Sequence, residues 1–269
     1  MKRIKLILVC GLVLALTGLT TLVVAAGALR DTKAIVRAMH GDVKYQADGV
    51  GPFLPLKVNM ELNAKTVLKS AAGADAWLQV NGLTSTVKLT ENTTVTLAKM
   101  EAMGAASDAD TSTDLKLDGG TVLGQVRKLS ANSDYRVMVP NGVAGVRGTD
   151  FQVTVTYQGN GNFTVVFTSV TGTIVCQVSL PVGQVGQSTQ TLNSGESWTV
   201  TGNSQGQTLT INQPQTVPAD VIAAINRAFG SFPPPAPPTG TPPPPSAPSP
   251  VAPTTSSSDT GGNSGGGGP

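Results

Sequence analysis

Apolar and polar side chains alternate strictly in several segments of this chain. In residues 151–158 the apolar side chains of Phe151, Val153, Val155 and Tyr157 are each followed by a polar one. A period of two is typical of a half-buried β-strand, so these odd-numbered side chains are expected to face a core. Similar short segments recur along the chain, at residues 34–39, 42–46, 75–80, 83–89, 93–100, 114–117, 121–129, 134–139, 162–170, 173–179, 189–193, 197–202 and 207–211.

Two pairs of these segments are joined by sequences that favour hairpin turns. Asn81 and Gly82 separate residues 75–80 from the segment that follows, and Asn-Gly is a strong short-range hairpin signal. A Gly-Asn-Gly turn at 159–161 separates 151–158 from the next strand segment in the same way. Many short strands at such intervals predict an all-β domain, which could be a sandwich, a barrel or a β-solenoid.

One segment near the end of the domain has helical rather than alternating periodicity. Pro218 suits the first turn of a helix, and Gly230 suits its end. The apolar face of this helix at 218–229 is formed by Val221, Ile222, Ile225 and Phe229. We therefore predict a capping segment at residues 213–230 that covers an open end or an edge of the sheets, with a partner-binding helix as the alternative.

The N-terminal end has the pattern of a targeting segment. Lysine and arginine at positions 2, 3 and 5 precede an apolar run over residues 6–26, and small residues follow. This order is typical of a secretory signal peptide, here residues 1–28, cleaved near Gly27 or Leu29. An uncleaved membrane anchor is the alternative, because about 20 apolar residues can span a bilayer.

The C-terminal end is of low complexity. Residues 231–269 are rich in Pro, Gly and Ser and hold most of the 19 prolines of the chain. Such a composition cannot bury enough apolar surface to fold, so we expect a disordered tail that acts as a spacer. Between the two ends, residues 29–212 have the usual length of one all-β domain.

Composition argues against several classes of function. A net charge of +2 with 13% charged residues gives no electrostatic reason to expect nucleic-acid binding. His40 is the only histidine, and Cys176, in an alternating segment, is expected to be a buried and inert thiol. These residues cannot supply a Cys/His metal cluster, and no nucleophile motif accompanies His40. We therefore expect no catalytic residue, no metal and no cofactor.

Three glycines recur at every third position in residues 142–148, and Arg147 stands between the last two. A strand pattern follows them, whereas phosphate-binding glycine loops lead into a helix. By parity with Phe151, Arg147 faces the core unless a bulge at Gly148 redirects it. In both cases we expect a structural guanidinium, held by carbonyls of adjoining turns and by a carboxylate from another strand. Losing it would leave buried acceptors unpaired, at about 1–3 kcal/mol each.

The segment VPNGVAGVRGTDFQV at 139–153 resembles the signature of the FecR domain. In that signature a proline-led strand, an alanine-containing turn and the pattern V-R-G-T-x-F-x-V occur together. The order of the flanking segments from residue 34 to residue 200 is similar as well. The resemblance implies an all-β periplasmic domain, a solenoid-like or twisted β-sandwich of short antiparallel strands. It also implies a structural role for the signature residues Gly145, Arg147, Gly148, Thr149 and Phe151.

The best-known FecR proteins are iron-transport sensors that pass an outer-membrane signal to a cytoplasmic sigma factor. This sequence departs from their plan, since it shows neither their anti-sigma region nor their receptor-contacting C-terminal domain. We therefore expect a non-enzymatic exported protein, periplasmic or secreted, with a binding or scaffolding role in the cell envelope. A membrane-anchored envelope signalling component is the alternative. The expected partner is an envelope protein or a polysaccharide, with no nucleic acid, and with membrane contact only through an uncleaved N-terminal segment.

Overall fold

The computed structural model describes residues 29–82, 85–103, 110–127, 129–180, 187–203 and 208–230. The expected signal peptide at 1–28 and the expected tail at 231–269 lie outside these residues. Short strands make up most of the described part, with two 3-10 turns, η1 (Ala47–Gly49) and η2 (Gly159–Gly161), and one helix, α2 (Ala219–Gly230). The all-β prediction is therefore confirmed.

The strands follow one another with short connections. Those before the long strand β10 are β1 (Arg30–Asp31), β2 (Ala34–His40), β3 (Val43–Gln46), β4 (Leu54–Pro55), β5 (Glu61–Leu62), β6 (Val67–Ser70), β7 (Asp75–Val80), β8 (Ser85–Leu89) and β9 (Thr94–Ala102). The remaining strands are β10 (Thr111–Val126), β11 (Asp134–Val139), β12 (Gly142–Arg147), β13 (Asp150–Tyr157), β14 (Asn162–Ser169), β15 (Thr173–Ser179), β16 (Gln187–Leu192), β17 (Glu196–Asn203), β18 (Leu209–Ile211) and β19 (Gln215–Thr216).

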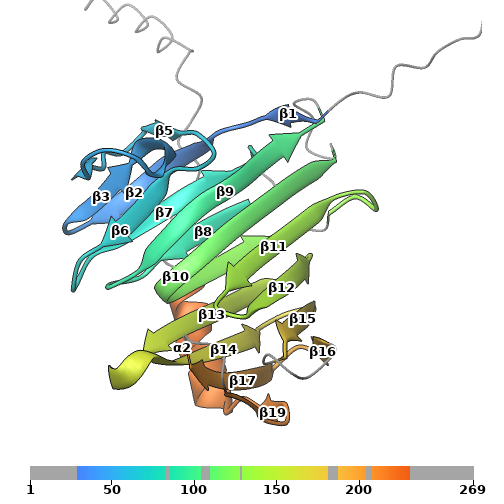
Figure 1. Ribbon diagram of the computed structural model, residues 1–269. Coiled ribbons are helices and arrows are strands. Elements are labelled where there is room, and N and C mark those ends of the chain that lie inside the picture. Colours follow the sequence, from blue (N-terminus) through green and yellow to red (C-terminus); the bar gives the residue numbers. More distant parts are fainter. Residues whose placement is uncertain are drawn as a thin grey trace, which may run out of the picture. The chain divides into compact units, whose positions relative to one another are not determined.

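These strands form two curled sheets (Figure 1). Sheet A has the order β4–β3–β6–β9–β10–β11–β12–β15–β16, with β1 beside the far end of β9. Sheet B has the order β5–β2–β7–β8–β10–β13–β14–β17, with β18 and β19 on β17. Among the described strands only β10 and β11 pair in parallel; the other pairs are antiparallel, as expected.

Strand β10 belongs to both sheets. Its residues 111–119 pair with β9, and its residues 120–126 pair with β8 and β13. The change of sheet falls at Gly120, which has a φ of 89° and where an added Cβ would lie 2.4 Å from the Cα of Thr93. Only glycine fits such a position, so a single residue allows one strand to serve two sheets.

A single apolar core lies between the inward faces of the two sheets. Sheet A contributes side chains such as Leu68 and Leu97, and sheet B contributes side chains such as Leu78 and Phe167, all of them fully buried. The alternation of buried positions in β13, at Phe151, Val153 and Val155, matches the sequence pattern. Burial of this apolar surface is the main term that stabilises the sandwich.

The two predicted hairpins are present. Val80 pairs with Ser85 across the Asn81-Gly82 turn, and Tyr157 pairs with Phe163 across the 159–161 turn. Tyr157 itself does not face the core as its parity predicted, because its side chain is 52% exposed. It stands at the end of β13, beyond the last core position, and its ring lies edge-on to Phe163 at a centroid distance of 6.4 Å.

Helix α2 packs on the outer face of sheet B. Ile225 and Phe229 are buried against Leu123 of β10 and Val170, which follows β14. The predicted bounds of the helix are correct within about one residue. Val221 was expected on the buried face but is 41% exposed, whereas the adjacent Ile222 packs against this cluster.

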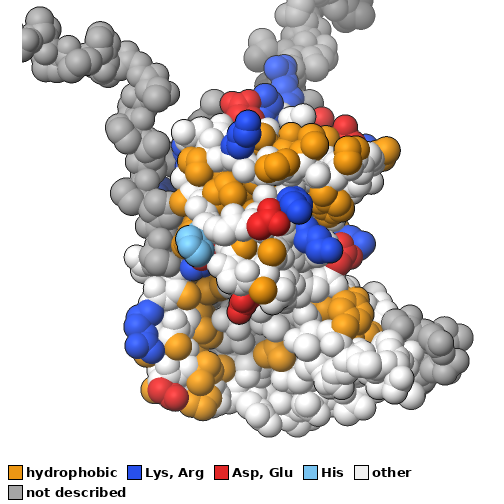
Figure 2. Space-filling model, turned by 90° about the vertical axis from the view of Figure 1, so that its left-hand side faces the viewer, with side chains coloured by type: hydrophobic (Ala, Val, Ile, Leu, Met, Phe, Trp, Pro, Cys, Tyr) orange, Lys and Arg blue, Asp and Glu red, His pale blue; other side chains and the backbone are white. Residues whose placement is uncertain are grey.

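The surface carries charges of both signs side by side. Figure 2 shows this on the side of the domain with β2, β3 and β6, where basic and acidic side chains are interspersed. Lys44 and Asp42, for example, form an ion pair of 3.2 Å there. Among the residues that the structure describes, no helix has the length and apolar character needed to cross a bilayer.

Candidate binding groove on sheet A

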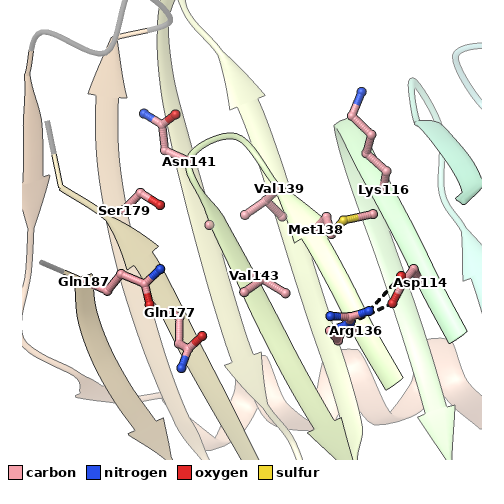
Figure 3. A pocket seen from close by; sticks show the side chains of 11 residues that line it. Asp114, Lys116, Arg136, Met138, Val139, Asn141, Val143, Gln177, Ser179 and Gln187 are labelled. Carbon is pink, nitrogen blue, oxygen red and sulfur yellow. Dashed lines mark hydrogen bonds and ion pairs between the residues drawn. The ribbon is translucent and has the colours of Figure 1, made fainter. Parts of the chain in front are cut away.

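The outer face of sheet A carries a groove of about 580 Å³ that crosses five strands. Its side chains come from β10, β11, β12, β15 and β16 and from the β11–β12 turn (Figure 3). The lining residues are Asp114, Lys116, Arg136, Met138, Val139, Asn141, Gly142, Val143, Gln177, Ser179 and Gln187. The groove combines apolar and polar side chains, which is usual for a binding site.

Apolar side chains form the middle of the groove and polar ones its two sides. Met138 and Val143 are direct cross-strand neighbours on β11 and β12, and both point outward from the sheet. Lys116 and Asp114 lie on one side in Figure 3, and Gln177 and Gln187 lie on the other. A ligand in the groove would thus contact an apolar centre between two polar margins.

An ion-pair network holds the β10 side of the groove. Arg136 binds both carboxylate oxygens of Asp114, at 2.8 and 3.0 Å, and its Nε lies 3.0 Å from a carboxylate oxygen of Asp134. The hydrogen bond to Asp114 raises the pKa of Arg136 above its usual range. A bidentate pair of this kind fixes the guanidinium plane, so the margin is rigid rather than adaptable.

The backbone explains why these strands lie so close together. The parallel pairing of β10 with β11 places Asp114 opposite Arg136. The β11–β12 turn is tight, with Asn141 at a φ of 58°. At Gly142 an added Cβ would lie 3.0 Å from the carbonyl oxygen of Gln177, so a small residue is needed where β12 meets β15.

The FecR-like signature lies at one end of β12, where the chain passes from sheet A to sheet B. Val146 is buried in sheet A and Phe151 is buried in sheet B, although their numbers have opposite parity. The change of parity occurs at Gly148, which has a φ of 63°. Of the two predicted options for Arg147, the redirected one is therefore correct, and the inward placement is wrong: Arg147 is exposed.

The Arg147 guanidinium binds a neighbouring loop. One of its terminal nitrogens donates to the backbone carbonyl of Ala131 at 2.5 Å and lies 3.4 Å from that of Ser130. The Ser130 hydroxyl in turn donates to the carboxylate of Asp110, which also accepts from Asn132 at 3.1 Å. The predicted carbonyl partners are thus present, and among the described residues no carboxylate forms an ion pair with Arg147.

The other signature residues lie around the same corner. The hydroxyl of buried Thr149 lies within hydrogen-bonding distance of the carbonyls of Arg147 and Thr173, at 3.1 and 3.0 Å. Phe151 packs on Gly124 of β10, where an added Cβ would lie 2.3 Å from the ring. Gly145 pairs with Val175, and a Cβ there would make only an ordinary contact of 3.6 Å. Their structural role stays a prediction.

The chemistry-bearing residues singled out from the sequence do not meet in one place. His40 is exposed at the end of β2, with its Nδ1 3.2 Å from the carbonyl oxygen of Gly73. Cys176 is buried in β15, as predicted, and burial raises the pKa of its thiol. Within the described part of the chain, no three His, Cys, Asp or Glu side chains are grouped so that they could hold a metal ion.

Sequence reasoning missed the groove itself. The sequence did contain a sign of it in β10 and β11, because Asp114, Lys116 and Arg136 alternate there with core residues and so face outward. That parity shows only that these side chains face away from the core. Which strands lie next to one another, and hence which outward side chains share a groove, depends on pairings such as β12–β15 across some 30 residues.

Comparison with known proteins identifies the domain. Residues 66–171 match the family model described as FecR protein. No curated protein sequence matches the chain significantly. Two crystal structures of a candidate anti-sigma factor from Parabacteroides distasonis are similar, with 16% and 17% identity and a TM-score of 0.41 each.

Those alignments cover 59% of this chain and 62% and 63% of the two solved chains, so this chain spans less than two thirds of them. The family match contains β10 to β14 and the complete signature corner. Residues 66–171 of this chain therefore form a FecR domain.

Proposed function

We propose that this protein is a non-enzymatic, exported component of a FecR-type regulatory system, which binds a partner in the cell envelope through the groove on sheet A. The observation that supports this most is the composition of the groove: an apolar centre at Met138 and Val143 beside a fixed ion-pair network. The groove includes Gly142 and Val143 of the signature segment, and most of its residues lie in the matched FecR domain.

The chemistry of the groove favours binding over catalysis. Its lining contains neither histidine nor cysteine. The two acidic groups nearest Arg136, Asp114 and Asp134, are bound to its guanidinium and so are not placed to act as general acid or base. FecR-domain proteins are regulatory rather than catalytic, which agrees with this arrangement.

The groove suits an extended polypeptide better than a sugar. Sugar-binding surfaces usually present aromatic platforms, and the described lining has none. Amide and hydroxyl groups of Gln177, Ser179 and Gln187 can bind a backbone, while Met138 and Val143 accept apolar side chains. An envelope protein is therefore the preferred partner, and a polysaccharide is the second candidate.

Crosslinking in living cells tests the groove. A photoreactive residue in place of Val143 is expected to give adducts with a partner, and the further substitution Met138→Asp is expected to abolish them. Thr210 is the matched control, because it is exposed on β18 of the other sheet. Adducts of equal yield from both positions, or adducts that survive Met138→Asp, would contradict a role for the groove.

Intact-mass measurement tests export separately. Cleavage at the small residues near Gly27 or Leu29 is expected to remove about 26–28 residues from protein recovered outside the cytoplasm. Retention of Met1 in the membrane fraction would instead support the anchored signalling component. Recovery of full-length protein in the cytoplasm alone would contradict both forms of the proposal.

A further inference from the structure

Strand β16 is the last strand of sheet A on one side. It pairs with β15, and no other described strand pairs with it (Figure 1). Its sequence, QSTQTL, contains neither a charged residue nor a proline. An unpaired strand edge presents N–H and C=O groups that can bind another strand, and proteins usually protect such edges with charge, proline or short length. Strand β16 has none of these protections.

The other outer strands of the described domain are protected in these ways. Strand β4, at the opposite end of sheet A, has two residues including Pro55, and β5 in sheet B has two residues including Glu61. The part of β2 that β5 leaves uncovered includes Arg37. Strands β1, β18 and β19 have at most three residues each. Within the described residues, β16 is therefore the only long edge without charge or proline.

The backbone groups of β16 divide by parity between β15 and the open edge. The N–H of Ser179 donates to the carbonyl oxygen of Asn141 at 2.9 Å, so the odd-numbered residues of β15 direct their backbone groups toward β12. The even-numbered ones face β16 and pair with its even-numbered residues. The N–H and C=O groups of Gln187, Thr189 and Thr191 therefore point to the open edge.

One of these edge groups already binds a side chain in place of a strand. The side-chain amide of Gln190 donates to the carbonyl oxygen of Thr191 at 3.1 Å. The side chains of Gln187, Thr189 and Thr191 are exposed, whereas Leu192 is buried. The edge thus has the alternation of a regular strand, and its backbone groups are accessible to a further strand.

We propose that β16 pairs with β16 of a second copy of this chain, antiparallel, about a two-fold axis at Thr189. In an antiparallel ladder, two residues directly opposite each other exchange both N–H···O=C bonds when their backbone groups face each other. The register centred on Thr189 places Thr189 opposite Thr189 and Gln187 opposite Thr191. All the residues of β16 that face the open edge then bind their counterparts in the second copy.

The side chains suit this register as well as the backbone does. Opposite residues share one face of the joined sheet, so exposed Thr and Gln side chains meet on the outer face, and Ser188 meets Gln190 on the inner face. No like charges are opposed across the axis, and Thr–Thr pairs are favourable. A two-fold contact is closed, because both copies use the same edge. The protected edge at β4 opposes further growth of sheet A.

The second copy would also extend the groove on sheet A. Gln187 lines the groove at β16 (Figure 3). In the register centred on Thr189, Thr191 of the second copy stands opposite Gln187, so the groove continues to a side chain of the second copy. The pairing of β16 does not require a partner in the groove, so the two proposals can fail separately.

Disulfide crosslinking tests both the contact and its register. In a Thr189→Cys protein, the two Cα atoms at the axis are expected to lie about 5.5 Å apart, within the range of about 4.4–6.8 Å that a disulfide spans. Thr191→Cys is the matched control, because Thr191 is also exposed on β16. Its two copies would be separated by about four residues along the strands, or roughly 14 Å. Both variants carry Cys10→Ser, so that buried Cys176 is the only other thiol.

Mild oxidation of the purified chain is expected to give a disulfide-linked dimer from Thr189→Cys and none from Thr191→Cys. Equal yields from the two variants, or no dimer from Thr189→Cys, would overturn the proposal. The same oxidation in living cells identifies the occupant of the edge. Adducts of Thr189→Cys with other proteins alone would mean that β16 receives a strand of a different protein, which would also overturn it.

Sedimentation of the purified chain measures the association without crosslinks. The mean mass is expected to rise from monomer to dimer with concentration. Thr189→Pro removes an N–H that points away from β15, and proline is tolerated in edge strands, so the Tm should stay close to that of the wild type. The dissociation constant of the dimer should rise about tenfold or more, because each copy loses a donor at the axis. Thr189→Ser keeps the donor and should dimerise as the wild type does.

Three results of the sedimentation experiment would contradict the proposal. A chain that stays monomeric up to about 1 mM does not associate through β16. A dimer that Thr189→Pro leaves equally stable is held by another surface. Assembly that continues beyond the dimer is incompatible with a closed two-fold contact.

Discussion

At the scale of single residues, Arg147 acts from the exposed face of β12, whereas its sequence parity had placed it facing the core. Its guanidinium reaches the carbonyls of Ser130 and Ala131 from the exposed side of β12. These carbonyls can exchange the guanidinium for water, unlike acceptors in a core. The cost of losing Arg147 should therefore be smaller than burial would have implied.

Replacing Arg147 by Ala is expected to lower the free energy of unfolding by about 0.5–1.5 kcal/mol, because the Ser130–Ala131 loop loses its donor. Arg147→Lys should recover only part of this, since an ammonium lacks the planar fork. Urea denaturation measures both changes. Arg127→Ala is a suitable control, because Arg127 is also exposed. Equal stability of the Arg147→Ala and Arg127→Ala proteins would mean that Arg147 is not structural and that the corner serves binding instead.

Asp110 gives the same loop a dependence on pH. The hydrogen bond from Ser130, with a second from Asn132, lowers the pKa of its carboxyl below the ordinary value of 3.8. A lowered folded-state pKa stabilises the protein above the unfolded pKa, and this contribution is lost as the pH falls through the folded value. Carboxyl titration by nuclear magnetic resonance should give a midpoint below 3.8, which Ser130→Ala should raise. A midpoint that Ser130→Ala leaves unchanged would show that the hydroxyl is not its cause.

At the scale of elements, the signature is a device that moves the chain from sheet A to sheet B. The two outer glycines of its Gly-Val-Arg-Gly core have different tasks. Gly148 has a φ of 63° and makes the turn, whereas Gly145 lies in a regular strand with room for a Cβ. The positive φ of Gly148 therefore distinguishes it from Gly145.

Gly148→Ala is expected to destabilise the fold by about 1–2 kcal/mol, the cost of a left-handed conformation for a residue with a Cβ. Gly145→Ala should be nearly neutral, because the added methyl group would meet only the carbonyl of Val175 at 3.6 Å. Thermal unfolding of the two proteins provides the comparison. A larger loss for Gly145→Ala than for Gly148→Ala would mean that close packing of β12 on β15, and not the turn, explains the glycines.

Local patterns predicted the elements far better than their arrangement. The alternation at Phe151, Val153 and Val155 and the Asn-Gly turn after β7 depend on neighbouring residues only, so both could be read correctly. Parity failed at Arg147, since one positive φ at Gly148 reverses the faces of everything beyond it. The passage of β10 through both sheets was missed for a similar reason, because Gly120 continues the strand instead of ending it.

The candidate groove was even harder to predict from the sequence than the arrangement of the strands. Its outward side chains are visible as polar positions in the strand pattern, but Asp114 and Gln177 are brought to one face only by the order of strands in sheet A. That order depends on long-range packing of the core rather than on local sequence. Sequence reasoning found the corner at the other end of β12, because the signature is a continuous segment.

At the scale of the whole described domain, the outer faces of the two sheets differ. The face of sheet A is left with a groove of mixed apolar and polar lining, whereas the face of sheet B is covered at Leu123 by α2. Helix α2 thus completes the sandwich on one side, and the other side keeps an accessible surface. The covered face should contribute to stability and the open face to binding.

Truncation at two positions separates these contributions. A chain that ends at Thr216 lacks α2 and exposes Leu123 and Val170, and it loses the burial of Ile225 and Phe229. Burying each such side chain stabilises a fold by about 1.5–3 kcal/mol, so the Tm should fall on the order of 10 °C. A chain that ends at Gly230 keeps these contacts and should change far less. Calorimetry measures the Tm of the two chains. Equal Tm values would show that α2 lies on sheet B without stabilising it.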